Sequence, residues 1–100
     1  MAFLVDTYDK PGTHDLRLKL RPAHLEHLKN NVPAEILLAA GPKLLDDGKT
    51  SFGSFLILNV KTREEAQAII DADPYTKGGL FEKVVISRWF RAILDGKFYV

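Results

Sequence analysis

The chain has 100 residues, of which 46% are hydrophobic and 27% charged, a composition typical of globular domains and not of disordered or membrane-spanning chains. Its net charge is +1, and its lysines and arginines are scattered, so no concentrated basic face for nucleic acid is expected. The absence of cysteine excludes disulfides, cysteine nucleophiles and thiolate metal ligands, which leaves histidines and carboxylates for polar chemistry.

Targeting and membrane signals are missing from the sequence. No apolar run approaches the roughly 18 residues of a membrane-spanning helix. The start, Met1 to Asp6, has neither a basic segment nor a long apolar segment and does not resemble a secretion signal. We therefore expect a cytoplasmic protein with a single domain over residues 1–100, and neither a membrane nor a nucleic acid as its partner.

The first elements predicted along the chain are a strand and a long helix. Residues 2–8 are mostly apolar and precede the turn-forming run at residues 9–12, which predicts a strand. Leucines then recur every three or four residues between 15 and 31, which predicts a helix that ends before Pro33. Pro22 lacks an N–H group, so it should kink this helix or begin its regular part.

Two further strands with a polar connection are predicted next. Residues 35–40 form an apolar run that Gly41-Pro42 should close, and residues 52–60 form another that is rich in Phe, Leu, Ile and Val. The segment between them contains Asp46-Asp47-Gly48-Lys49, which is typical of a hairpin connection.

The last part of the chain predicts a second helix and a final strand. Thr62 is a suitable N-cap, and Glu65 stands three residues later, as in a capping box. This helix should end at Pro74, and the β-branched and aromatic residues 80–90 predict the final strand. Residues 92–100 give no clear pattern and could be an extension that packs on a neighbour.

The resulting order, β-α-β-β-α-β, predicts an α+β protein with the ferredoxin-like fold, in which two helices cover one face of an antiparallel four-stranded sheet. Residues 55–58 and 84–86 are apolar at consecutive positions, as in strands buried on both faces. Two helices cannot cover both faces. We therefore expect a homodimer in which a second sheet packs on the open face.

The first helix carries polar residues inside or beside its apolar stripe. At about 100° per residue, Arg21 lies within this stripe and His24 on its margin. The apolar residues that form the stripe are Leu18, Leu25, Leu28 and Val32. Burial of a cation or an imidazole is costly without a partner, so each should contact a hydrogen-bonding group elsewhere. The best candidate is Asp73, in Asp73-Pro74-Tyr75.

Several short motifs follow one another in a fixed order along nearly the whole chain. They are, in chain order, Arg21-Pro22-Ala23-His24-Leu25 with Leu28, Ala39-Ala40-Gly41-Pro42, Gly53-Ser54, Glu64-Glu65-Ala66, Asp73-Pro74-Tyr75 and Gly79-Leu80-Phe81. In this ordered set the chain resembles the YCII-related family of the dimeric α+β barrel superfamily.

The resemblance implies a sheet-to-sheet dimer with an active site in a cleft between helices and sheet, built around a histidine–aspartate pair. In this sequence those residues are His24 and Asp73. Most of the family has no assigned reaction. Some members resemble dehydrochlorinases or lyases that act on chlorinated aromatic intermediates, and related barrels include lactone isomerases and cofactor-free monooxygenases.

The leading hypothesis is a small dimeric enzyme that transfers a proton on a carbonyl-containing or phenolic metabolite, as a lyase, dehydrochlorinase or isomerase. His24 would be the base, and Asp73 would fix its tautomer and stabilise the imidazolium. Arg21 could hold a substrate carboxylate, enolate or phenolate, while Ser54 and Tyr75 could add polar contacts. We expect no cofactor and no metal, since His24 and His27 lack an obvious third ligand.

Other interpretations fit the same residues. His24 could be a hydrogen-bonded core histidine, with Asp73 only a helix-terminal residue. Arg21 could form an ion pair with Asp71, Asp73 or Glu82. His27 is expected on the solvated flank of the helix. The alternative function is a non-enzymatic dimer that binds a small molecule in the same cleft or supports a partner.

Overall fold

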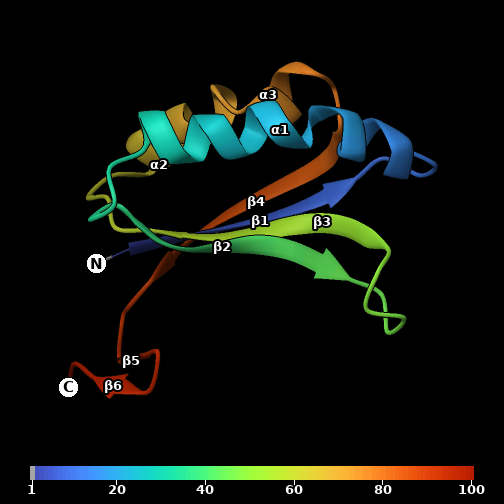
Figure 1. Cartoon of the computed structure of the whole chain (residues 1–100). Helices are drawn as coiled ribbons and strands as arrows, with labels where there is room; N and C mark the ends of the chain where they lie inside the picture. Colours follow the sequence, from blue (N-terminus) through green and yellow to red (C-terminus); the bar gives the residue numbers. More distant parts are fainter. Residues whose placement is uncertain (1) are drawn as a thin grey trace.

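The computed structural model describes residues 2–100 as a four-stranded antiparallel sheet, covered on one face by helices, with a small separate hairpin at its C-terminal end (Figure 1). The elements are β1 (Ala2–Asp9), α1 (His14–Asn31), β2 (Leu37–Leu44), β3 (Ser51–Leu58), α2 (Arg63–Asp71), α3 (Pro74–Lys77), β4 (Phe81–Trp89), β5 (Ile93–Leu94) and β6 (Lys97–Phe98). The strand order in the large sheet is β2-β3-β1-β4. The predicted ferredoxin-like α+β class is confirmed.

An apolar core fills one end of the space between helices and sheet. Strand residues alternate between the two faces, so Phe3 and Val5 of β1 point toward the helices together with Leu56 and Leu58 of β3. Residues of the helices and the loops complete this core: Leu28, Val32, Val60, Ala66 and Ile70. All of them are at most 6% exposed.

Helix α1 has the predicted length, but only part of its predicted stripe, Leu28 and Val32, is buried in the core. Leu18 and Leu25, expected in the core, are 54% and 46% exposed, whereas Arg17, His24 and His27 are buried. The leucine spacing alone was misleading, because the side of α1 that faces the sheet is mostly polar. The helix also continues through Pro22, so this proline does not begin its regular part.

Two predicted boundaries on either side of β3 are wrong. Strand β2 does not end at Gly41-Pro42 but continues to Leu44. It is an edge strand, where a proline without an N–H group is tolerated. The second helix ends at Asp71, and Pro74 begins a separate one-turn helix, α3, that the sequence did not predict. A proline suits the first turn of a helix, where its missing N–H would have no intrahelical partner.

Local hydrogen bonds fix the ends of these elements as predicted. The backbone N–H of Glu65 donates to Thr62 Oγ1 at 3.2 Å, which caps α2. In the β2–β3 loop, Asp47 accepts hydrogen bonds from the Thr50 hydroxyl and from the backbone N–H groups of Thr50 and Lys49. These bonds lower the pKa of Asp47 from 3.8 to about 2. The Asp-Asp-Gly-Lys segment is thus a turn.

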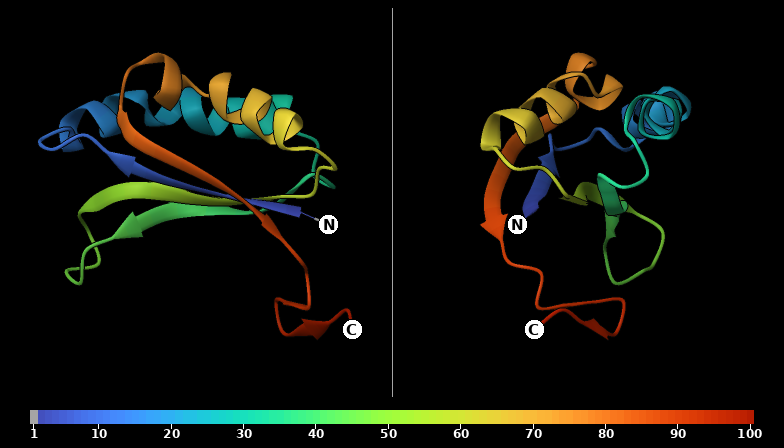
Figure 2. Two further views of the ribbon diagram at one scale, coloured as in Figure 1. Left: turned by 180° about the vertical axis from the view of Figure 1, so that it is seen from behind. Right: turned by 90° about the vertical axis from the view of Figure 1, so that its left-hand side faces the viewer.

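The face of the sheet opposite the helices is open (Figure 2). By register, Leu4, Phe55, Val85 and Trp89 lie on it, and Leu4, Phe55 and Trp89 are only partly buried. Phe90, which follows β4, is 64% exposed. None of the described helices is long and apolar enough to cross a membrane.

Candidate active site

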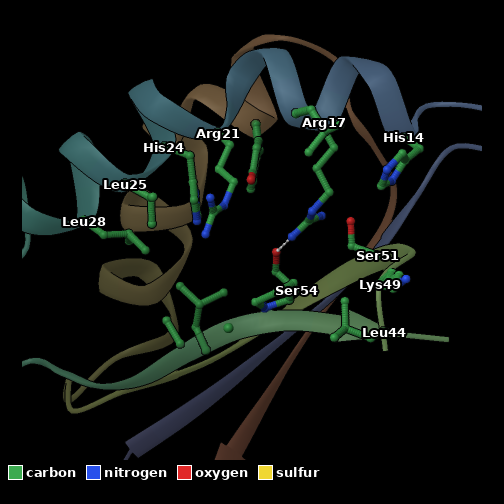
Figure 3. Close-up of a pocket in the computed structure, with 16 residues that line it drawn as sticks. His14, Arg17, Arg21, His24, Leu25, Leu28, Leu44, Lys49, Ser51 and Ser54 are labelled. Carbon is green, nitrogen blue, oxygen red and sulfur yellow. Dashed lines mark hydrogen bonds between the residues drawn. The ribbon is translucent and has the colours of Figure 1, made fainter. Parts of the chain in front are cut away.

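A pocket of about 400 Å³ lies between α1 and strands β2 and β3, at the end of the helix–sheet layer that the apolar core does not fill (Figure 3). Small-molecule sites range from about 300 to 1,000 Å³. Arg17, Arg21, His24, Ser54 and Tyr75 supply polar groups to its wall. Leucines from α1 and the sheet supply the apolar part: Leu18, Leu25, Leu28, Leu44 and Leu56.

His24 and Asp73, the predicted pair, are in direct contact although they are 49 positions apart in the chain. His24 Nδ1 lies 2.9 and 2.8 Å from the two carboxylate oxygens of Asp73. Asp73 is 1% exposed, and its Oδ1 also accepts the backbone N–H of Tyr75 at 2.9 Å. Because the carboxylate needs a donor, we expect a neutral His24 to carry its proton on Nδ1, which leaves a free lone pair on Nε2.

Asp73 reaches His24 because of how the chain enters α3. Asp73 is the N-cap of this short helix, and Pro74 fixes the backbone of its first residue. Helix α1 packs closely on the C-terminal end of α3, where a Cβ atom on Gly78 would lie 2.5 Å from a methyl carbon of Leu20. The two helices are thus in close contact near the His24–Asp73 pair.

Tyr75 orders the site by stacking. Its ring is 1% exposed and lies 3.9 Å from the imidazole of His24, with 15° between the planes. The Arg17 guanidinium lies 4.6 Å from the same ring centroid. Arg17 and His24 are two helical turns, about 10 Å, apart on one face of α1, so the ring occupies the space between them. Burial raises the pKa of Tyr75 above its usual 10.0, an effect that the positive charge of Arg17 partly opposes.

Arg17 is a member of this site that the sequence analysis missed. It is 3% exposed and contacts both carboxylate oxygens of Asp9 at 3.0 and 2.9 Å. It also donates to Ser54 Oγ, and the backbone N–H of Ser54 donates to Thr7 Oγ1 at 2.8 Å. A signal was available, because Arg17 precedes Arg21 by four residues and His24 by seven and therefore shares their face of the helix.

Arg21 and Ser54 occupy different positions relative to the pocket. The exposed Arg21 reaches into it beside His24 (Figure 3) and forms no ion pair with any residue in the described part of the chain, so the alternative pairing with Asp71, Asp73 or Glu82 is absent. Ser54 is 3% exposed and bonded to Arg17. Arg21 is therefore available for a ligand, whereas Ser54 chiefly holds Arg17.

The other two histidines lie elsewhere. His27 was expected in solvent but is 7% exposed, and it lies 3.3 Å from the carbonyl oxygen of Ile69 and 3.3 Å from Asn31 Nδ2. His14 is exposed at the start of α1, at the far end of the pocket. Within residues 2–100, no group of three or more His, Asp or Glu side chains is arranged to hold a metal ion.

Comparisons with known proteins identify one family, through a family model and through individual relatives. The family model for the YCII-related domain matches residues 1–90. Protein YciI from Escherichia coli is 37% identical over 91 residues, which cover 86% of this chain and 93% of that protein. The derivative of benzaldehyde biosynthesis cluster protein C from Emericella nidulans is 35% identical over 83 residues, which cover 77% and 85% of the two chains.

One solved structure extends the comparison to an enzyme. The 5-chloro-2-hydroxyhydroquinone dehydrochlorinase from Burkholderia phenoliruptrix, in complex with 2,5-dihydroxybenzoquinone, has a TM-score of 0.80 and 32% sequence identity. The match covers 90% of this chain and 94% of the dehydrochlorinase.

Proposed function

Because this chain belongs to the family of YCII-related domains, as its match over residues 1–90 shows, we propose that it is an enzyme that transfers a proton on a small hydroxylated or carbonyl-containing ring compound. The observation that carries the proposal is the contact of His24 Nδ1 with Asp73 inside a pocket of about 400 Å³. A dehydrochlorinase of the same fold supports the choice of substrate class.

His24 acts as the base in this proposal. Its Nδ1–H donates to Asp73, so Nε2 accepts a proton from a substrate hydroxyl or from a carbon next to a carbonyl group. The carboxylate then stabilises the imidazolium that forms. Stacking on Tyr75 holds the imidazole ring in one orientation during the transfer.

Arg21 stabilises the negative charge that develops on the substrate. Of the described residues that line the pocket, none is Asp or Glu, whereas Arg17, Arg21 and Lys49 are cations. Arg17 is neutralised by Asp9, and Lys49 lies near His14 at the other end of the pocket, so Arg21, beside His24, would bind an enolate, phenolate or carboxylate oxygen. On a chlorinated hydroxyhydroquinone, the elimination would start from the keto tautomer, in which a hydroxyl proton has moved to the chlorine-bearing ring carbon. When Nε2 of His24 takes a proton from a second hydroxyl, the electron pair of that O–H bond forms a carbonyl group, the ring double bond shifts and chloride leaves, so that the net loss is HCl and the product is a quinone.

A panel of chlorinated hydroxyhydroquinones and related phenols tests this proposal through chloride release. We expect His24→Gln to lower turnover by about 10²–10⁴-fold, the usual contribution of a general base. His27→Gln, which alters a buried histidine of the same helix outside the pocket, should retain turnover. If His24→Gln had the same turnover as the wild type, His24 would not be the general base. Binding of 2,5-dihydroxybenzoquinone with no turnover of any compound would instead favour the alternative function, a non-enzymatic protein that binds a small molecule in this pocket.

The homodimer expected from the sequence is part of the proposal. Apolar side chains on the open face of the sheet would be covered if two copies packed sheet to sheet, an arrangement that buries roughly 2,000 Å² in an obligate dimer. Light scattering at low micromolar concentration tests it, and a stable monomer there would contradict it. The cytoplasmic location and the single domain over residues 1–100 stay predictions.

A further inference from the structure

Residues 90–100 form an arm that projects from the end of β4. Strands β5 and β6 pair as a two-stranded hairpin, with Ile93 opposite Phe98. Its turn is Asp95-Gly96, with φ of 53° and 74°, the conformation that Asp-Gly adopts in tight hairpins. Arg91 and Lys97 lie 4.8 and 5.3 Å from the centroid of the Tyr99 ring. The arm therefore has a defined shape of its own.

This arm has almost no cover from its own chain. Phe90, Phe98 and Val100 are 64%, 68% and 78% exposed, and Ile93 and Tyr99 are 48% and 45% exposed. The views in Figures 1 and 2 agree that the hairpin stands away from the helices, on the side of the open sheet face. An isolated two-stranded hairpin is at best marginally stable in water. A hairpin with this many apolar side chains needs a surface to pack on.

We propose that the arm packs on the sheet of a second copy of this chain, so that two arms clasp the dimer reciprocally. The inference rests on the sheet-to-sheet dimer proposed above and assigns the segment that locks it. The family model ends at residue 90, so the arm is an addition to the part of the chain that matches the family.

A second copy suits the arm because it covers both uncovered surfaces at once. The open sheet face, with Phe55, Val85 and Trp89, and the apolar arm lie on the same side of one chain. Under two-fold symmetry each arm meets the sheet of the other copy, and no further partner is needed.

The area of the arm is large enough to matter for association. Aromatic side chains bury about 150–250 Å² each, and the arm carries three of them with 45–68% of their surface exposed. With Ile93 and Val100, two arms would add on the order of 1,000 Å² to the sheet contact, most of what a specific interface of standard size buries.

A charge at position 98 in the full-length chain tests the clasp. Phe98→Glu alters a side chain that is 68% exposed in one chain, so folding of the chain should be unaffected. We expect the dimer dissociation constant, measured by analytical ultracentrifugation, to rise about a hundredfold or more, because each dimer loses two buried aromatic rings. The matched control is Leu45→Glu, which is 50% exposed in the β2–β3 loop and should leave the constant unchanged.

A photoreactive benzophenone amino acid in place of Phe98 gives a second measurement on a mixture of ¹⁴N and ¹⁵N chains. We expect crosslinks between chains of different isotope, at residues of β1, β3 or β4. Crosslinks confined to one chain, or an unchanged dissociation constant in Phe98→Glu, would overturn the clasp while the dimer stands. A monomeric wild type would overturn both.

Discussion

The two ends of the helix–sheet layer differ in chemistry although the same strands and the same helix build both. Toward the start of β1, Phe3 and Val5 pack on an apolar core. Toward its end, Thr7 and Asp9 meet Arg17 and Ser54, beside the His24–Asp73 pair. Buried polar groups rarely exceed well-packed apolar ones in their contribution to stability. The difference indicates that the apolar end holds the fold together, and the polar end is where the proposed chemistry would take place.

The largest effect on stability is expected at the apolar end. Phe3→Ala should lower the free energy of unfolding by about 3–5 kcal/mol, because it removes a fully buried ring and leaves a cavity. Turnover of the molecules that stay folded should change little. Urea unfolding followed by Trp89 fluorescence measures the loss, with the exposed Leu45→Ala as control. A cost below about 1 kcal/mol would contradict the assignment of this end as the structural core.

A smaller net effect is expected for the buried ion pair at the polar end. Arg17→Met leaves the carboxylate of Asp9, 5% exposed, without its partner and should cost about 3 kcal/mol. Adding Asp9→Leu should restore most of that loss, since the unpaired buried charge is then gone. A double-mutant cycle by urea unfolding measures this coupling. If the double variant were no more stable than Arg17→Met, the ion pair itself would stabilise this end of the layer, which would contradict the account.

Asp73→Asn should separate chemistry from stability most clearly. An asparagine can still cap α3, so the free energy of unfolding should change by no more than about 1 kcal/mol. Turnover should nevertheless fall by about 10²–10⁴-fold, because a neutral amide does not stabilise the imidazolium of His24. Parallel kcat/KM and unfolding measurements check both values. A loss of stability without a loss of turnover would make the pair a structural feature.

The smallest effect is expected from Tyr75 at alkaline pH. Its pKa is raised by burial in the folded protein, so its contribution to stability is complete below the pKa of the unfolded chain, about 10, and is lost as the pH rises through the folded value. Phenolate absorbance should therefore appear at higher pH than for free tyrosine. The difference between wild type and Tyr75→Phe isolates this titration, and a phenolate that forms below pH 10 would contradict a buried ring.

The fold was predictable because strand patterns and caps are local. The short apolar runs that form β1 and β3 and the Thr62 cap lie within short segments, and the structure confirms them. The burial of α1 was not predictable from its leucines, because the polar side of this helix meets partners that are distant in sequence. Arg17, for example, needs Asp9 and Ser54, 8 and 37 positions away.

The candidate site was found through its motif, and only in part. The residues at 24 and 73 were singled out as polar groups in need of partners, and the structure brings them together. Arg17 was overlooked, because its helical spacing to Arg21 and His24 shows only that it shares their face, and its partners Asp9 and Ser54 lie outside the motif. The helix α3 was also missed, because a single turn that starts with Pro74 leaves no periodic pattern. The catalytic role of the pair stays a prediction.

The central claim, that the polar end of the layer holds His24 ready to accept a proton at Nε2, can be tested in the imidazole ¹⁵N spectrum at a pH where the rings are neutral. His24 should carry its proton on Nδ1, which lies 2.8 Å from Asp73, and His27 should carry it on Nε2, which lies 3.3 Å from the carbonyl oxygen of Ile69. Opposite tautomers at these two positions are the predicted result. A His24 with its proton on Nε2 would contradict the account.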